Sequence, residues 1–208
     1  MRIKICGITS VHDALLAAEL GADALGIIAV PGTPRYVTPA LVAEIRAALP
    51  PFLPLVVVAQ NATQAHGYEK SADVFQLYEG PLVASTRCVR VVRVRDAASL
   101  AAIAEAAAEP VAAVHLDAYH EKSLGGACVV FDWGLAVAAK APLRGKPLIL
   151  AGGLTPENVA EAIALVHPYA VDVSSGVEAS PGKKDPQKLR DFIAAVRRSQ
   201  QSPIESGV

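Results

Sequence analysis

One residue near the start of the chain has the setting of a general base. Cys6 ends a short apolar run, precedes Gly7 and follows Lys4 by two positions. Side chains alternate along a strand, so Lys4 and Cys6 share one face. A nearby cation favours the thiolate, which is both a base and a nucleophile. The alternative is a small buried core cysteine, which is common in proteins.

Two aspartates compete for the role of a partner acid. Asp132 stands between Phe131 and Trp133, whose rings could shield its carboxyl from water and raise its pKa into the range of a general acid. Its ordinary role would be to cap the short helix expected to follow. The residues alone leave the choice between Asp132 and Asp117 open. If Asp132 is only a helix cap that points to solvent, the role of the acid passes to Asp117.

Anions could be recognised at three turns. Arg35 is a lone cation on a rigid, proline-flanked turn, where it suits a carboxylate or a phosphate, or it is an ordinary solvated arginine. Two glycine-bearing turns follow the last two apolar runs, and backbone N–H groups there could hold a phosphate. The expected phosphate-binding residues are Gly152, Gly153, Ser174, Ser175 and Gly176.

These residues need a scaffold, and the order of apolar runs indicates one. Eight short runs rich in Val, Ile and Leu read as strands buried on both faces: 2–6, 24–30, 55–60, 74–78, 88–95, 111–117, 147–151 and 170–174. Helical patterns fill most gaps: 10–20, 38–49, 96–108, 155–166 and 185–199, with weaker ones at 63–71 and 133–140.

This alternation predicts an α/β fold, a single compact (β/α)8 (TIM) barrel. The gap 79–87 is too short for a good helix, so we expect a shortened connection after strand 4. An open doubly wound sheet is the runner-up. Its usual nucleotide-binding versions lose support because no G-x-G-x-x-G or P-loop motif is present. In a barrel, the residues named above would follow strand ends, where barrel active sites lie.

Composition fits one folded domain. The 208 residues are 52% hydrophobic with a mean hydropathy of +0.37, which excludes a disordered chain. The 19 basic and 20 acidic residues give a net charge of −1, so we expect no nucleic-acid or membrane partner. We expect residues 1–199 to form the barrel and 200–208 a disordered tail.

The cysteines and histidines set two further expectations. Cysteines at 6, 88 and 128 cannot all pair and form no C-x-x-C motif, so we expect a reduced, cytoplasmic protein. The five histidines have no spacing typical of a metal cage, so we expect no metal site.

Taken together, the motifs resemble those of phosphoribosylanthranilate isomerases, the third-step isomerases of tryptophan biosynthesis. The resemblance covers nearly the whole chain. It rests on these segments: Lys4-Ile5-Cys6-Gly7-Ile8-Thr9, Pro34-Arg35-Tyr36-Val37, Gln76-Leu77, Phe131-Asp132-Trp133, Leu150-Ala151-Gly152-Gly153-Leu154, Val171-Asp172-Val173-Ser174-Ser175-Gly176-Val177-Glu178 and Pro181-Gly182-Lys183-Lys184-Asp185.

The resemblance implies a monomer or homodimer without cofactor or metal, acting on a small phosphosugar. The implied reaction is the Amadori rearrangement of N-(5-phosphoribosyl)anthranilate to 1-(2-carboxyphenylamino)-1-deoxyribulose 5-phosphate. Asp132 would protonate the furanose ring oxygen, and Cys6 would remove the proton from C2. Arg35 would meet the anthranilate carboxylate. Gln76 and Asp172 would bind the substrate, with Asp172 facing ribose hydroxyls or supporting the surroundings of Cys6.

The chain departs from the family pattern at two places near the site. Tyr78 replaces a usual histidine, and residues 125–128 read Gly-Gly-Ala-Cys where Gly-Gly-Thr-Gly is usual. Two alternatives therefore stay open. One is a related barrel isomerase with an altered phosphosugar substrate, and the other is a barrel that binds phosphoribosyl ligands without turning them over.

Overall fold

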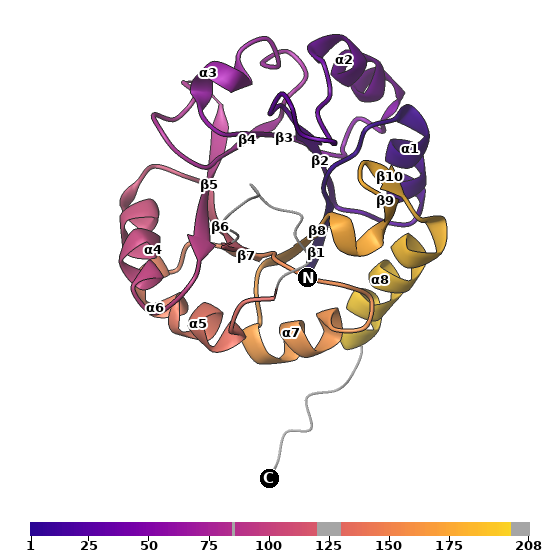
Figure 1. The fold of residues 1–208 in the computed structure, drawn as a ribbon. Coiled ribbons are helices and arrows are strands. Elements are labelled where there is room, and N and C mark those ends of the chain that lie inside the picture. The colour runs from indigo at the N-terminus through magenta and orange to yellow at the C-terminus, as the bar shows by residue number, and fades with distance from the viewer. Residues whose placement is uncertain (85, 120–129, 201–208) are drawn as a thin grey trace.

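The computed structural model describes residues 1–84, 86–119 and 130–200. Its centre is a closed barrel of eight parallel strands in chain order, which confirms the predicted (β/α)8 fold (Figure 1). The strands are β1 (Arg2–Ile5), β2 (Ala24–Ile28), β3 (Leu55–Ala59), β4 (Val74–Leu77), β5 (Arg87–Val94), β6 (Ala113–Ala118), β7 (Leu148–Leu150) and β8 (Ala170–Val173).

A ring of helices surrounds the barrel (Figure 1). The helices are α1 (Val11–Glu19), α2 (Pro39–Ala48), α3 (Ala62–Ala65), α4 (Ser99–Ala108), α5 (Trp133–Ala138), α6 (Lys140–Leu143), α7 (Val159–Val166) and α8 (Pro186–Ser199). Side-chain oxygens of Ser10, Thr38 and Asp185 accept hydrogen bonds from the first turns of α1, α2 and α8. These caps explain why the three helices begin close to the predicted positions.

The connection after β4 is shortened, as predicted. The described residues between β4 and β5, which are 78–84 and 86, form no helix. The weakly predicted helix at 63–71 is reduced to the four residues of α3. After β8 the chain forms a 3-10 turn (Ser175–Val177) and a small antiparallel pair, β9 (Glu178–Ser180) and β10 (Lys183–Lys184), which the sequence patterns did not predict.

Pairing of the first and last strands closes the barrel. β1 and β8 are parallel neighbours in a register that sets Lys4 beside Asp172. Along β1, Ile3 and Ile5 are fully buried in the main hydrophobic cluster, which also contains Phe192 of α8. Because side chains alternate along a strand, Lys4 faces the barrel interior.

The last described residue, Gln200, is joined to the first by a hydrogen bond. Gln200 caps α8 and its Oε1 accepts a hydrogen bond from the Met1 amino group at 3.1 Å, while the rest of the expected tail, 201–208, lies outside the described residues. The changed loop at 125–128, with Cys128, also lies outside them. Within the described ranges, no helix is both long and apolar enough to cross a membrane.

Candidate active site

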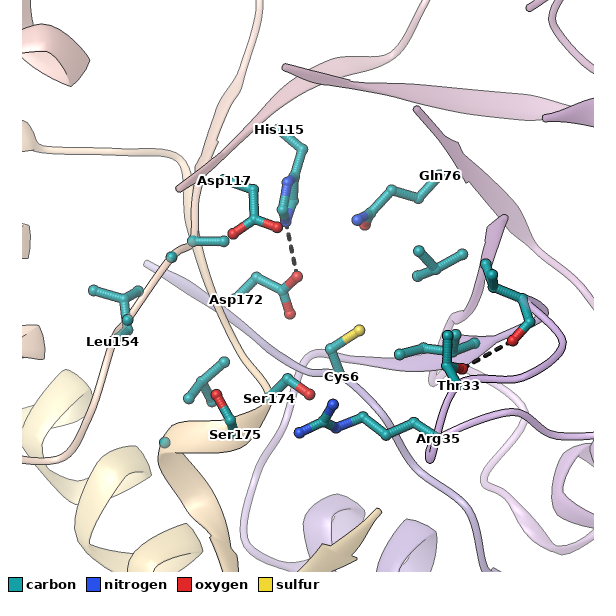
Figure 2. Close-up of a pocket in the computed structure, with 18 of the residues that line it drawn as sticks. Cys6, Thr33, Arg35, Gln76, His115, Asp117, Leu154, Asp172, Ser174 and Ser175 are labelled. Atoms are coloured by element: carbon teal, nitrogen blue, oxygen red, sulfur yellow. Dashed lines mark hydrogen bonds and ion pairs between the residues drawn. The ribbon is translucent and has the colours of Figure 1, made fainter. Parts of the chain in front are cut away.

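A cavity opens where the strands end, the place at which (β/α)8 barrels carry their active sites (Figure 2). It brings together residues on or just after β1, β2, β3, β4, β6, β7 and β8. Its lining includes Cys6, Arg35, Gln76, Asp172 and all five residues expected to bind phosphate, Gly152, Gly153, Ser174, Ser175 and Gly176. The structure therefore gathers every sequence-predicted site residue except Asp132.

The deeper layer of the site is a buried group of charged and polar side chains. Lys4 Nζ lies 2.7 Å from Asp172 Oδ2, and His115 Nε2 lies 2.8 Å from the same oxygen. Burial alone would raise the pKa of Asp172, but the charge of Lys4 and the hydrogen bond from His115 lower it to about 2. Asp172 is therefore ionised at neutral pH.

A second layer lies further along the strand ends, with Cys6 and Asp117 two positions after Lys4 and His115, and Tyr78 just after β4. It consists of Cys6, Tyr78 and Asp117, all of which line the cavity. Burial raises the pKa of the Cys6 thiol, although the charge of Lys4 acts in the opposite direction. The expectation that a neighbouring cation would make Cys6 a ready thiolate is thus corrected, because loss of solvation outweighs the cation.

The two other members of this layer are also affected by burial. Burial raises the pKa of Asp117 above the ordinary value of a carboxyl group, with Asp172 adding to the effect. Burial raises the pKa of Tyr78 well above that of an ordinary phenol, and the negative charge of Asp117 adds to this effect. Tyr78 therefore stays protonated in the physiological range, whereas Asp117 is biased toward its neutral, proton-donating form.

Asp132 is placed differently from the sequence-based expectation. Its side chain is exposed at the start of α5, where its Oδ1 accepts a 2.8 Å hydrogen bond from the Gly134 amide. Asp132 is absent from the described lining of the cavity, and the neighbouring rings of Phe131 and Trp133 leave it exposed. The structure shows a helix cap here, whereas the carboxyl groups of Asp117 and Asp172 line the cavity.

Arg35 is not the lone cation that the sequence suggested. Its Nε lies 2.9 Å from Glu178 Oε1 and one terminal nitrogen lies 2.6 Å from Oε2, so the two side chains form a bidentate pair. Lys184 Nζ also reaches Glu178 Oε1, at 2.9 Å. Burial would raise the pKa of Glu178, but Arg35 and Lys184 hold it below its ordinary value. This network fixes the turn after β2 against the segment after β8.

The edge formed by the last two strands has the features of an anion site. Gly152 and Gly153 line the cavity and have positive φ values of 85° and 66°, a conformation that suits glycine. Ser174 Oγ is buried and has no hydrogen-bond partner among the described residues. Gly176 leaves no room for a side chain, because a Cβ there would lie 2.0 Å from the carbonyl oxygen of Leu154.

Two cavity residues were not assigned a role from the sequence. His115 and Tyr78 each line the cavity, and the signal that could have found them is spacing. His115 precedes Asp117 by two positions and Tyr78 follows Gln76 by two, the same relation that joins Lys4 to Cys6. Among the described residues, no group of three or more His, Cys, Asp or Glu side chains could hold a metal ion.

A closed barrel whose cavity holds buried acid–base groups at the carboxyl ends of its strands defines the chain as a (β/α)8-barrel enzyme. Comparison with known proteins identifies the family within this class of enzymes. The family model described as N-(5'phosphoribosyl)anthranilate (PRA) isomerase matches residues 3–195. The chain therefore belongs to this family, and it is an isomerase of tryptophan biosynthesis.

Curated relatives agree over almost the whole chain. The N-(5'-phosphoribosyl)anthranilate isomerase of Magnetococcus marinus is 47% identical, with 96% of this chain and 97% of the relative covered. The protein of the same name from Citrifermentans bemidjiense is 46% identical, with 95% and 97% covered. Neither relative has a large additional region beyond the matched barrel.

Solved structures show the same fold. Phosphoribosyl anthranilate isomerase from Thermotoga maritima is 34% identical, with a TM-score of 0.84 and with 95% of this chain and 99% of that chain covered. A second structure, of the isomerase in complex with reduced 1-(o-carboxyphenylamino)-1-deoxyribulose 5-phosphate, is 33% identical, with a TM-score of 0.80 and the same coverage.

Proposed function

We propose that the protein converts N-(5'-phosphoribosyl)anthranilate to 1-(2-carboxyphenylamino)-1-deoxyribulose 5-phosphate. The observation that carries the proposal is a single cavity that contains both proton-transfer groups and a candidate anion site. The proton-transfer groups are Cys6 and Asp117, and the anion site is formed by Gly152, Gly153 and Ser174. The substrate has matching parts, since a phosphate and a sugar with a reactive C1–C2 unit must be bound together.

Asp117 is our candidate for the general acid, in place of Asp132. A neutral Asp117 carboxyl would give its proton to the furanose ring oxygen as the C1–O bond breaks, and the nitrogen lone pair would form a C1=N bond. The raised pKa of Asp117, caused mainly by burial, supports this role because it favours the protonated carboxyl. Asp132, exposed and engaged as a helix cap, has no comparable setting.

Cys6 is our candidate for the general base. A Cys6 thiolate would take the proton from C2, the electrons would form a C1=C2 bond, and the iminium nitrogen would become an amine. The resulting enolamine loses its hydroxyl proton and gains one at C1, so substrate and product are isomers. Burial opposes thiolate formation at Cys6, and the charges of Lys4 and Lys184 favour it.

The remaining residues would bind the substrate. The amides of Gly152, Gly153 and Gly176, with Ser174 and Ser175, would hold the phosphate. Arg35 would meet the anthranilate carboxylate from its place beside Glu178. Two other buried acceptor atoms, Gln76 Oε1 and Asp172 Oδ1, have no partner among the described residues and would accept hydrogen bonds from the ribose hydroxyls.

The function can be tested with a fluorescence assay, because anthranilate derivatives fluoresce and conversion can be followed directly. The purified protein should convert the phosphoribosyl substrate. Cys6→Ala should lower kcat by about 10²–10⁴-fold, the usual contribution of a well-placed proton transfer. The fold should be intact by circular dichroism. Near-wild-type kcat in Cys6→Ala would falsify the role of Cys6.

The alternatives predict different outcomes of the same assay. A barrel with an altered phosphosugar substrate would leave this substrate unchanged but convert a related one. A binding protein would bind the phosphoribosyl compound without converting it, and Cys6→Ala would not alter that result.

The oligomeric state of the chain also stays a proposal. One related structure concerns monomers generated from the dimeric Thermotoga maritima isomerase, and we propose a monomer or homodimer for this chain.

A further inference from the structure

One buried histidine contacts the site without taking part in the proton transfers proposed above. His115 on β6 and Lys4 on β1 meet the same oxygen, Oδ2 of Asp172 on β8, at 2.8 and 2.7 Å. Each of the three side chains is more than nine-tenths buried. Two strands thus hold one carboxylate oxygen from two sides.

The direction of the hydrogen bond from His115 follows from the charge of its partner. A carboxylate with a pKa of about 2 is ionised at neutral pH and can only accept hydrogen bonds. His115 must therefore carry a proton on Nε2 and donate it to Asp172. The hydrogen bond fixes the ring orientation of His115 and the rotation of the Asp172 carboxylate together.

The other carboxylate oxygen of Asp172, Oδ1, takes no part in these two contacts. Asp172 lines the cavity, and its Oδ1 has no partner among the described residues. Figure 2 shows Asp172 between His115 and Cys6, with one oxygen on the His115 contact and the other turned away from it. A carboxylate fixed at Oδ2 offers Oδ1 in one defined direction on the substrate side.

His115 lines the cavity, but the neighbouring strands offer its side chain no polar partner at the same level of the barrel. Its register partners on the neighbouring strands are Val91 and Ile149, both apolar. Burying an imidazole among such residues costs free energy that an aliphatic side chain would not cost. Among the described residues, Nε2 of His115 contacts Asp172, while its Nδ1 is buried without a hydrogen-bond partner.

We propose that His115 is a positioning residue for the isomerisation, which it serves by fixing Asp172 so that Oδ1 accepts a hydrogen bond from a hydroxyl next to the reacting C1–C2 unit. The proposal rests on the function proposed above. Without His115, the carboxylate would be held by Lys4 alone and could rotate about its terminal bond. The substrate hydroxyl would then lose a pre-oriented acceptor.

The test compares two substitutions at the same position. His115→Gln keeps an N–H donor near the place of Nε2, whereas His115→Leu fills the space without one. We expect kcat/KM of His115→Leu to fall about 10- to 100-fold, the usual effect of losing a hydrogen bond to a charged group. His115→Gln should stay within about fivefold of the wild type, which is roughly 1 kcal/mol.

Val91→Ala is the matched control, because Val91 is the register partner of His115 on β5 and carries no hydrogen-bonding side chain. It should lower the melting temperature and leave kcat/KM within about twofold. The proposal is overturned if His115→Leu keeps its activity within the same range. It is also overturned if both His115 variants fold and lose activity equally, because a donor would then make no difference.

Crystal structures of the variants separate this proposal from the proposed function. If the wild-type protein converts no substrate, the proposed function fails, but the position of Asp172 can still be observed. The carboxylate should keep its orientation in His115→Gln and change it in His115→Leu. An unchanged Asp172 in His115→Leu would show that His115 does not position it, whatever the reaction.

Discussion

At the scale of single residues, the two aspartates show how environment separates identical side chains. Asp117 is buried at the end of β6 inside the cavity, and burial raises its pKa. Asp132 is exposed, and its Oδ1 accepts a hydrogen bond from the Gly134 amide. The chemistry available to a carboxyl group is set by solvation and partners, which supports Asp117 as the proposed proton donor.

The same change at both positions should have opposite effects. Asp117→Asn should lower kcat by about 10²–10⁴-fold, because the amide has no proton to give. Asp132→Asn should leave kcat within about twofold and barely alter stability, since asparagine is an equally good helix cap. Steady-state fluorescence kinetics on both variants would decide the assignment. Large loss of activity in Asp132→Asn alone would return the acid to that residue.

Asp117→Asn should also be more stable than the wild type at pH 7. A carboxyl group whose pKa is raised in the folded state is destabilising when ionised, and asparagine removes that charge. Urea denaturation of the two proteins would measure the difference. A gain in stability with a loss of activity is the pattern expected of a group retained for chemistry.

At the scale of elements, β2 makes room for the catalytic candidate on β1. A Cβ on Gly26 would lie 2.6 Å from Cys6 Sγ and 3.0 Å from Cys6 Cα. Any other residue at position 26 would push the Cys6 sulfur or its backbone out of place. The glycine of one strand thus sets the position of a side chain on the next, so these strands act as one unit.

Gly26→Ala should therefore be less stable than the wild type by about 1–3 kcal/mol, the usual cost of overpacking. The loss should shrink in a Cys6→Ala background, because the sulfur makes the closest of these contacts. Urea denaturation of the four proteins of this double-mutant cycle measures the coupling. Equal losses in both backgrounds would mean that the clash with the sulfur does not determine the effect.

At the scale of the whole molecule, barrel closure and the site share one ion pair. Lys4 on β1 and Asp172 on β8 are register partners at the seam where the first strand meets the last. A similar contact, between Arg35 and Glu178, links segments that are 143 positions apart, and Lys184 binds the same carboxylate. The polar groups that shape the cavity therefore also join the ends of the fold.

This arrangement predicts a loss of stability in acid. The pKa of Asp172 is about 2 in the folded protein against an ordinary 3.8, so its ionised form stabilises the fold above about pH 5. That contribution, about 2 kcal/mol, is lost as the pH falls through 3.8 toward 2. Asp117, whose pKa is raised, contributes in the opposite direction.

Comparison with Asp172→Asn isolates the effect of this one carboxyl group. Free energies of unfolding at pH 6 and pH 3 would be measured for both proteins by urea denaturation. The variant should be less stable at pH 6, because Lys4 is left buried without its partner. Its stability should decline less on acidification than that of the wild type. Equal declines would contradict the assignment of the acid-sensitive contribution to Asp172.

The sequence by itself determined the architecture and much of the lining of the cavity. Strand and helix patterns are local, so eight buried runs and their intervening helices predicted the barrel and its shortened connection after β4. The rule that barrel sites follow strand ends then pointed to Cys6 and the glycine turns, and the family resemblance added Gln76; all of them line the cavity.

Only the tertiary structure decided which polar groups meet. His115 and Asp172 are 57 positions apart, and Arg35 and Glu178 are 143 apart, so no local pattern relates them. The choice between Asp117 and Asp132 depended on solvation, because both follow apolar residues near expected element boundaries. Burial and partners are properties of packed elements, and they fix pKa values that residue type and spacing leave open.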